Sequence, residues 1–214
     1  MSAEPGLRER KKEQTRVLIA DTARRLFAER GFERVPVAEV ARASEVSEQT
    51  VFNYFPTKED LVYWRLGSFE DELLATIRDR EPGESVAAAF GRFVRTPRGM
   101  LASQDEETQE RLAGVARMIA ESPALLAREQ QIFARYTDAL AELLAAEQGD
   151  DGVEPWVVAN ALMGVHRALV TYSRRRVVAG ARQPRLARDV RAQAQRALAR
   201  LDAGLGDYGI RTGP

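Results

Sequence analysis

The spacing of apolar side chains predicts helices along almost the whole chain. Alanine, leucine, arginine and glutamate dominate, and no stretch alternates apolar and polar residues as a half-buried strand does. Glycine and proline interrupt the helical pattern at Gly31, Pro56, 81–83, 97–99, 122–123, 149–152 and 180–184. We therefore predict an all-α protein.

Three helices are predicted at the start of the chain. The first covers about 9–30, because apolar residues recur there at helical spacing and Gly31 can cap the C-terminus. A short helix follows at 37–43. Ser47 is a suitable N-cap for a third helix at 48–54. A long helix followed by two short ones, which are joined by a three-residue turn, is typical of helix-turn-helix DNA-binding domains.

The third predicted helix has two different faces. Val51 and Phe55 lie four residues apart and point toward the core. The opposite face carries three polar side chains and a phenylalanine: Glu48, Gln49, Asn53 and Phe52. Glutamine and asparagine suit adenine in the major groove, and a phenylalanine can contact a thymine methyl group. We predict that this face contacts base edges. The alternative is an ordinary bundle of helices with a solvated polar face.

The overall charge neither favours nor excludes a nucleic-acid partner. The 214 residues carry 32 basic and 32 acidic side chains, so the net charge is 0. Near the N-terminus, however, five basic residues outweigh two acidic ones: Arg8, Arg10, Lys11, Lys12 and Arg16 against Glu9 and Glu13. A short basic arm of this kind suits contact with phosphate groups.

The sequence offers little for catalysis. It contains one histidine and no cysteine, and we find no phosphate-binding loop, nucleophile elbow or cluster of metal ligands. We predict no catalytic residue, no metal and no cofactor. The polar N-terminus predicts no secretory signal, and the apolar run 156–172 is shorter than the ~20 residues that span a bilayer. We expect a cytoplasmic protein with no membrane partner. An enzyme that uses carboxylates or lysines, and a helical protein whose head binds another protein, are the alternatives.

The stretch from Ile19 to Leu61 resembles the head of TetR-type repressors. The residues that carry the resemblance occur in order, with matching helix breaks, at 26–32, 37–41 and 46–61. The resemblance implies that Ser47–Tyr54 is the recognition helix. It also implies eight DNA-contacting residues, of which Ser47 begins the helix. The expected base-facing positions are Glu48, Gln49, Thr50, Phe52 and Asn53. The expected phosphate contacts are Thr50, Tyr54 and Lys58.

Three positions depart from the pattern of the family. Pro36 occupies a position where the family usually has a threonine, which caps the second helix and contacts a phosphate. Glu45 stands in the turn where glycine is usual. Phe52 replaces a common tyrosine and so lacks its hydroxyl group. We therefore omit Pro36 from the expected contacts.

The resemblance also implies the organisation of the remaining chain. Residues 1–57 are expected to form the helix-turn-helix domain, 58–204 a helical body for ligand binding and dimerisation, and 205–214 a disordered tail. The implied function is that of a repressor that binds double-stranded DNA at a palindromic operator. A small-molecule effector, which the sequence does not identify, would release it.

Two stripes in the body fit a homodimer through the last two helices. The run 156–172 has a stripe of small side chains at Val157, Ala161, Gly164 and Ala168, and a larger apolar stripe at Val158, Leu162, Val165, Leu169 and Tyr172. A final helix at about 185–201 has a stripe at Leu186, Val190, Ala194, Ala197 and Leu201. Two such helices from each subunit would form a four-helix interface. Alternatively, the stripes pack within one subunit.

Aromatic and flexible residues of the middle helices are the candidates for a ligand pocket. The preferred six are Phe93, Met118, Phe133, Tyr136, Met163 and His166, and the wider set adds Tyr63, Phe69, Phe90, Met100 and Tyr172. Each of them also fits a plain hydrophobic core, and a lone histidine is more often a core residue than a ligand contact.

Overall fold

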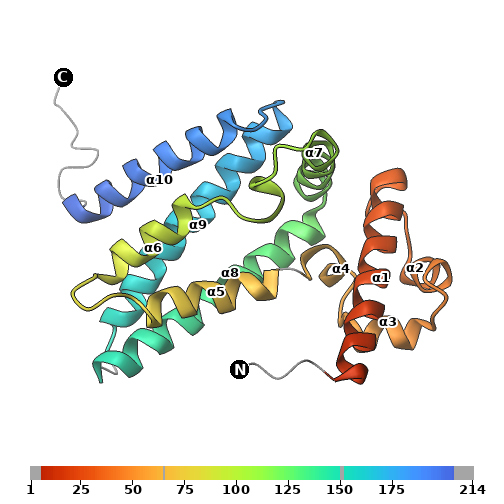
Figure 1. Cartoon of the computed structure of the whole chain (residues 1–214), viewed down its shortest axis with the longest axis horizontal. Helices are drawn as coiled ribbons and strands as arrows, with labels where there is room; N and C mark the ends of the chain where they lie inside the picture. Colours follow the sequence, from red (N-terminus) through yellow and green to blue (C-terminus); the bar gives the residue numbers. More distant parts are fainter. Residues whose placement is uncertain (1–5, 65, 150–151, 205–214) are drawn as a thin grey trace. The chain divides into compact units, whose positions relative to one another are not determined.

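A computed structural model of the chain describes residues 6–64, 66–149 and 152–204. Within these ranges the chain forms ten α-helices and one short 3-10 helix, and no strand (Figure 1). The prediction of an all-α fold is confirmed. The tail predicted at 205–214 lies outside the described residues.

The helices begin and end close to the predicted glycine and proline breaks. In chain order they are α1 (Leu7–Arg30), α2 (Val37–Ala43), α3 (Glu48–Tyr54), α4 (Asp60–Tyr63), α5 (Leu66–Arg78), α6 (Val86–Arg95), the 3-10 helix η1 (Gly99–Leu101), α7 (Glu106–Glu121), α8 (Pro123–Gln148), α9 (Glu154–Val178) and α10 (Arg185–Ala203). No helix of the described ranges is both long enough and apolar enough to cross a bilayer.

The chain divides into two compact units. One consists of Met1–Gly67 with Arg117–Glu129, and the other of Ser68–Ala116 with Gln130–Pro214. The corner between α7 and α8 therefore belongs to the same unit as α1–α4. The domain boundary expected at residue 57 stays a prediction.

The first unit has a core made by its helix-turn-helix elements. α1 packs against α2 and α4, and α2 packs against α3. Phe27, Val51 and Phe55 are almost completely buried, and the rings of Phe27 and Phe32 meet edge to face with centroids 5.1 Å apart. Burying a phenylalanine side chain contributes roughly 1.5–3 kcal/mol. This core determines which face of α3 remains exposed.

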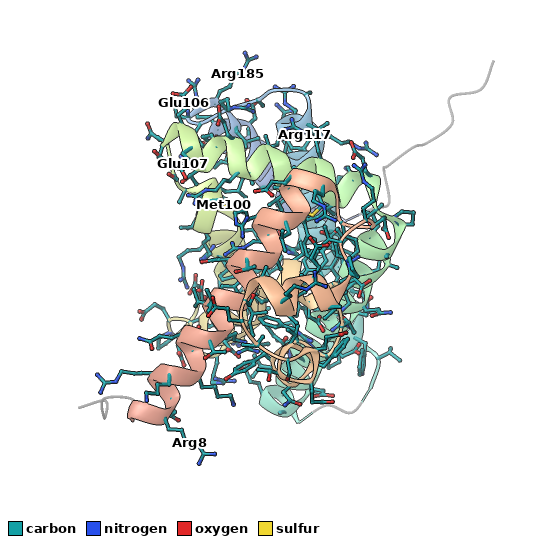
Figure 2. The ribbon with its side chains drawn as sticks, turned by 90° about the vertical axis from the view of Figure 1, so that its right-hand side faces the viewer. Arg8, Met100, Glu106, Glu107, Arg117 and Arg185 are labelled. Atoms are coloured by element: carbon teal, nitrogen blue, oxygen red, sulfur yellow. The ribbon has the colours of Figure 1, made fainter. Side chains whose placement is uncertain are left out.

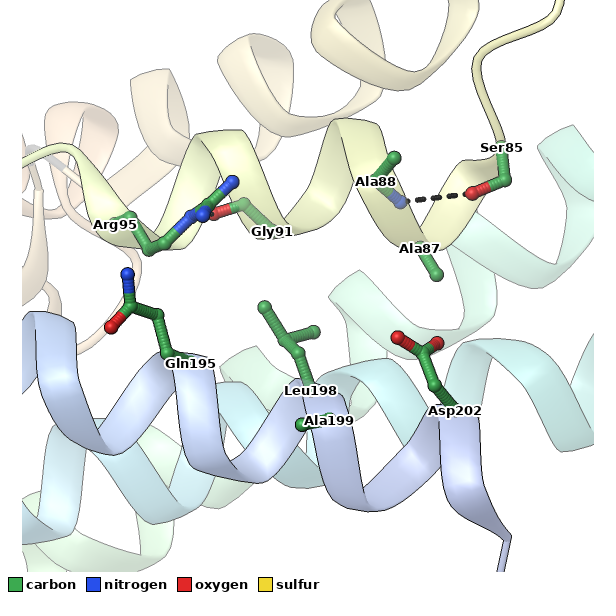
Figure 3. Close-up of a pocket in the computed structure, with 9 residues that line it drawn as sticks. All are labelled: Ser85, Ala87, Ala88, Gly91, Arg95, Gln195, Leu198, Ala199 and Asp202. Atoms are coloured by element: carbon green, nitrogen blue, oxygen red, sulfur yellow. Dashed lines mark hydrogen bonds between the residues drawn. The ribbon is translucent and has the colours of Figure 1, made fainter.

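In the second unit, α10 packs along α9 and α6. The approach of α6 to α10 is close, since a Cβ atom placed on Gly91 would lie 2.9 Å from Leu198 Cδ1. A groove of about 290 Å³ runs beside this contact (Figure 3). Arg95 and Gln195 lie at one end of the groove and Asp202 at the other, with alanines between them.

The apolar stripe of α10 is only partly buried within the protomer. Leu186 and Ala194 are fully buried, and Leu186 packs in one cluster with Ala113, Ala116 and Val177. Val190, Ala197 and Leu201 are half-buried, so the dimer through this stripe stays a prediction. The exposed residues of α10 are mainly polar and small, among them Arg188, Gln195 and Ala199.

Candidate nucleic-acid interface

Helix α3, the expected recognition helix, begins at a well-formed cap. Ser47 Oγ accepts a hydrogen bond from the Thr50 backbone N–H at 3.0 Å and lies 2.8 Å from Thr50 Oγ1. The cap stabilises the first turn of α3, because the backbone N–H groups there have no carbonyl acceptor within the helix. Ser47 and Thr50 thus have a structural role that does not depend on DNA.

The exposed face of α3 matches the predicted one. Glu48, Gln49 and Asn53 are exposed, and the Phe52 side chain is 43% exposed, an unusual position for a large apolar ring. Thr50 and Tyr54 are half-buried. Val51 and Phe55, each 1% exposed, hold the helix on the core. Four of the residues that are expected to face bases are therefore exposed on one short helix, and Thr50 is half-buried.

Gln49 and Asn53 form a pair on this face. Gln49 Nε2 donates to Asn53 Oδ1 at 3.1 Å, four residues along the helix. Each amide keeps an unused donor and acceptor, the combination that recognises the N6 and N7 groups of adenine. The pair can therefore present a joint hydrogen-bonding surface to adjacent bases.

The turn before α3 contains Glu45 in a left-handed conformation. Its φ is +54°, and it is the only described non-glycine residue with positive φ. The Val46 N–H donates to the Ala41 carbonyl at 3.0 Å and closes the turn. The turn thus has the shape that a glycine would give it, and Glu45 adopts that shape at a conformational cost.

Pro36 is the N-cap residue of α2. Its φ is −74°, and its carbonyl accepts hydrogen bonds from Glu39 N and Val40 N at 3.1 and 3.4 Å. It supplies no side-chain cap to the helix. A proline fits here because an N–H at the start of a helix has no partner inside the helix.

Lys58 has a role that the sequence did not suggest. Its Nζ donates to the Phe32 carbonyl at 2.6 Å, and it lies 4.2 Å from the centroid of the Phe32 ring. Burial lowers the pKa of Lys58, while Glu33 and Glu59 oppose this effect. Lys58 therefore ties the segment after α3 to the end of α1. Two donor hydrogens remain for a phosphate.

The segment after α3 is held by a capping box and by α8. Thr57 N donates to Asp60 Oδ2 at 3.0 Å, and Asp60 N donates to Thr57 Oγ1 at 3.3 Å, which is the reciprocal pattern of a capping box. Asp60 Oδ1 also accepts two hydrogen bonds from Arg128, at 2.8 and 2.9 Å. No local sequence pattern indicates this contact, because the two residues are far apart in the chain.

Two further hydrogen bonds join the α7–α8 corner to the other elements of this unit. Tyr63 Oη donates to the Leu125 carbonyl at 3.1 Å, and Ser122 Oγ donates to Glu33 Oε1 at 2.6 Å. Ser122 is only 2% exposed. Arg128 and Leu125 of α8 thus contact the two ends of α4, and Ser122 contacts Glu33 after α1.

The basic arm is part of α1, which starts two residues earlier than expected. Arg8, Arg10, Lys11 and Lys12 are exposed on its first turns, and the Arg8 side chain points away from the helix (Figure 2). The Arg16 guanidinium lies 5.7 Å from the centroid of the Phe55 ring, next to the end of α3. The basic arm is therefore the first part of α1, and Arg16 of this helix contacts Phe55 at the end of α3.

In the second unit, four of the predicted pocket residues contribute to an aromatic cluster around Phe69. Its ring lies 5.0 Å from Phe93, 5.6 Å from Tyr136 and 4.6 Å from His166, between centroids. Phe133 contacts His166 edge to face at 5.4 Å. Phe69 belongs to the wider set of pocket candidates but not to the six preferred residues. Met163 is fully buried in the same unit, whereas Met118 belongs to the other unit.

Burial sets the charge state of this cluster. Desolvation lowers the pKa of His166 to about 4, with a smaller contribution from Arg167, and burial raises the pKa of Tyr136. Both side chains are neutral near pH 7. In the described part of the chain, no group of three acidic or histidine residues could hold a metal ion.

Comparison with known proteins adds to this description. The sequence pattern of "Bacterial regulatory proteins, tetR family" matches residues 19–63. The transcriptional regulator TcmR of Streptomyces glaucescens is 28% identical over 170 residues, 77% of this chain and 75% of the relative. MftR, a mycofactocin biosynthesis regulator of Mycobacterium tuberculosis, is 26% identical over 156 residues, 69% of this chain and 73% of that protein.

Among solved structures, NalD of Pseudomonas aeruginosa shares the fold. Its TM-score is 0.56 at 18% identity, and the match covers 87% of this chain and 96% of NalD. NalD is described as the secondary repressor of the MexAB-OprM multidrug efflux pump. The match supports the helical architecture over 87% of the chain, well beyond the residues matched by the sequence pattern.

Proposed function

Because this chain belongs to the TetR family of bacterial regulatory proteins, we propose that it is a repressor. It binds a palindromic operator as a homodimer and leaves the DNA when a small-molecule effector occupies its body. The observation that carries the proposal is the exposed face of α3, where Gln49, Phe52 and Asn53 point away from the core. Such a protein acts in the cytoplasm, where the DNA lies.

In this proposal the residues of the head divide into two groups. Glu48, Gln49, Phe52 and Asn53 face base edges, and Thr50, Tyr54 and Lys58 face phosphates. Base contacts give sequence preference, and phosphate contacts give position and affinity. Ser47 acts through the cap of α3.

The proposed dimer uses α9. The stripe of small residues there is exposed: Val157 is 62% exposed, and Gly164 and Ala168 are exposed further along the same face. Trp156 and Val153 extend the apolar surface, with 42% and 77% exposure. Small side chains allow two helices to approach closely. On α10, Val190, Ala197 and Leu201 are half-buried and remain available to the interface, whereas Leu186 and Ala194 are fully buried.

The two-fold axis of the dimer would place two recognition helices about 34 Å apart, one turn of DNA, which suits a palindrome. A ligand that changes this separation lowers the affinity for the operator.

The effector site of the proposal is the aromatic cluster of Phe69, Phe93, Phe133, Tyr136 and His166. Neutral aromatic side chains suit an apolar or aromatic ligand, and His166 can supply one hydrogen bond. Phe133 lies on α8, five residues after Arg128, which holds Asp60. Because α8 is one continuous helix, a ligand that displaces Phe133 also moves Arg128.

A mobility-shift assay tests the proposal. The full chain is mixed with the DNA upstream of its own gene and with a duplex of the same length and scrambled sequence. We expect salt-sensitive binding that prefers a palindrome. Gln49→Ala should reduce that preference by about 1–3 kcal/mol at a single base pair in each half-site. Equal affinity for both duplexes would contradict sequence-specific binding.

Release by an effector needs a separate test. The protein–DNA complex is titrated with aromatic and apolar small molecules, and dissociation is followed by fluorescence anisotropy. An active compound should lose its effect in Phe133→Ala while the operator affinity remains. If the variant and the wild type respond alike, the effector site lies elsewhere.

A further inference from the structure

The end of α9 and the start of α10 form a strongly basic surface. Between residues 174 and 191 there are seven arginines and one acidic residue, Asp189, in a chain whose net charge is 0. This excess is larger than that of the N-terminal arm. We call the surface formed by Arg175, Arg176, Arg182, Arg185 and Arg188 the arginine corner.

A groove of about 480 Å³ opens at the arginine corner. It is lined by Arg176, Ala179, Gly180, Ala181, Arg182, Gln183 and Arg185. Contacts with α7 fix the turn that lines this groove. Gln183 N donates to Gln109 Oε1 at 3.3 Å, and Val177 and Leu186 pack on α7. The arginines therefore project from a fixed turn.

Most of these arginines have no acidic partner within the described residues. Arg175, Arg182, Arg185 and Arg188 are exposed and form no ion pair there. Arg182 Nη1 reaches only the neighbouring Ala181 carbonyl, at 3.5 Å. Glu107 of α7, the helix packed beneath, pairs with Arg111 of its own helix at 3.8 Å. The positive charge of the corner is thus left for an external anion.

Arg176 is held differently from the exposed arginines. Its Nη2 pairs with Asp189 at 3.2 Å, and its Nε is buried without a hydrogen-bond acceptor among the described residues. Arg176 lines the groove, where Asp189 balances its charge in part.

The spacing of the exposed arginines favours a partner with repeated charges. Arg185 and Arg188 lie three residues apart on α10, roughly 4.5 Å along the helix axis, and Arg182 precedes them in the turn before the helix. Double-stranded DNA carries about one negative charge per 1.7 Å of its length. A single small anion would engage only part of such a row.

We propose that the arginine corner is a second phosphate-binding surface, and that its partner is the backbone of double-stranded DNA. The inference rests on the proposed function, since it assumes that the protein works on DNA. The corner contacts no base edges. It adds affinity without sequence preference, in contrast to α3.

The test compares two double variants with the same change of charge. Arg182→Ala/Arg185→Ala changes the corner, and Arg78→Ala/Arg196→Ala removes two other exposed arginines that form no ion pair among the described residues. Binding of the full-length proteins to an operator duplex and to a scrambled duplex is measured by fluorescence anisotropy, between about 50 and 200 mM salt. Circular dichroism checks that each variant is folded, and Arg188→Glu provides an independent change of the corner.

We expect the corner variant to bind both duplexes more weakly. The slope of its affinity against salt concentration should fall by about 0.9 for each phosphate that the variant no longer neutralises. The ratio of operator to scrambled affinity should not change, and the control variant should keep the wild-type slope. Arg188→Glu should weaken binding in the same direction.

The inference would be overturned if the corner variant kept the wild-type slope of DNA affinity against salt concentration, or if the two double variants weakened DNA binding equally. A titration with inorganic pyrophosphate gives the third contrary outcome: the corner binds this anion, but its substitution leaves the slope for DNA unchanged. Absence of an operator preference in the wild-type protein is a different result. It contradicts the proposed function, while the corner can still be measured on the scrambled duplex.

Discussion

Arg128 on α8 donates two hydrogen bonds to a single oxygen of Asp60, from Nε at 2.9 Å and from Nη2 at 2.8 Å. The other Asp60 oxygen accepts from the Thr57 N–H in the cap of α4. One carboxylate thus serves both the local capping box and a contact with a helix that is distant in the chain. The segment that follows the recognition helix is held from two directions.

Removal of this ion pair should destabilise the protein. The two side chains are only 26% and 16% exposed, so the pair is better protected from water than a surface salt bridge. We expect Arg128→Ala to lower the free energy of unfolding by about 1–3 kcal/mol in urea denaturation. In a double-mutant cycle with Asp60→Asn, which keeps an acceptor for the cap, the coupling energy should exceed about 0.5 kcal/mol. Additive effects would show that the pair contributes nothing.

Glu45→Gly should stabilise the turn before α3. Glu45 has a φ of +54°, and glycine adopts this conformation without a clash of the Cβ atom. Glu45→Ala is the matched control, because it removes the same charge and keeps a Cβ. We expect the glycine variant to be about 1 kcal/mol more stable than the alanine variant in thermal unfolding. Equal melting temperatures would mean that the turn is not strained.

Lys58→Met should weaken both the fold and DNA binding. The methionine keeps an aliphatic chain over the rings but cannot donate the hydrogen bond to the Phe32 carbonyl. We expect the unfolding free energy to fall by about 1–2 kcal/mol. DNA affinity should fall equally for all sequences. Lys58→Arg keeps the charge and should recover most of the affinity; a methionine variant that binds DNA like the wild type would remove Lys58 from the phosphate contacts.

His166 should make stability depend on pH in the acidic range. Its pKa is lowered from 6.5 to about 4 in the folded protein, mainly by desolvation. Between pH 6.5 and about 4, His166 is therefore protonated in the unfolded chain but stays neutral in the folded chain. The free energy of unfolding consequently decreases as the pH falls toward 4. The decrease should reach up to about 3 kcal/mol.

His166→Phe should remove this part of the pH dependence. His166 is the only histidine of the chain, so the difference between wild type and variant isolates its titration. The measurement is urea denaturation at a series of pH values from about 7 to about 4. Parallel curves for the two proteins would show that His166 keeps an ordinary pKa when the protein is folded.

Gly164→Asp should separate the proposed dimer into monomers. No atom lies within 4 Å of the position of a Cβ on Gly164, so an aspartate fits within the protomer. The control is Gly114→Asp on α7, another helical glycine with nothing within 4 Å of such a Cβ. Sedimentation velocity should give a monomer for the first variant and the wild-type state for the second. Intact dimers in both would place the interface away from this face of α9.

Much of the head follows from local sequence. The bounds of α2 and α3, the cap at Ser47 and the capping box at Thr57 all depend on residues within a few positions of each other. The faces of α3 follow in the same way, because Val51 and Phe55 recur at the spacing of a helix turn. The apolar stripes of α9 and α10 also follow from the sequence. Periodicity alone, however, does not distinguish packing within one subunit from packing between two subunits.

The helices, their breaks and the residues that α3 exposes could thus be derived from sequence alone, since short-range hydrogen bonds and helical periodicity control these features. The neighbours of each side chain emerged only from the folded chain. There Lys58 binds the Phe32 carbonyl, Asp60 binds Arg128, and Leu186 of the α10 stripe packs in the protomer core. Phe69 likewise lies among the aromatic rings of the body. These contacts join residues from distant parts of the chain, and their partners are selected by the packing of whole helices.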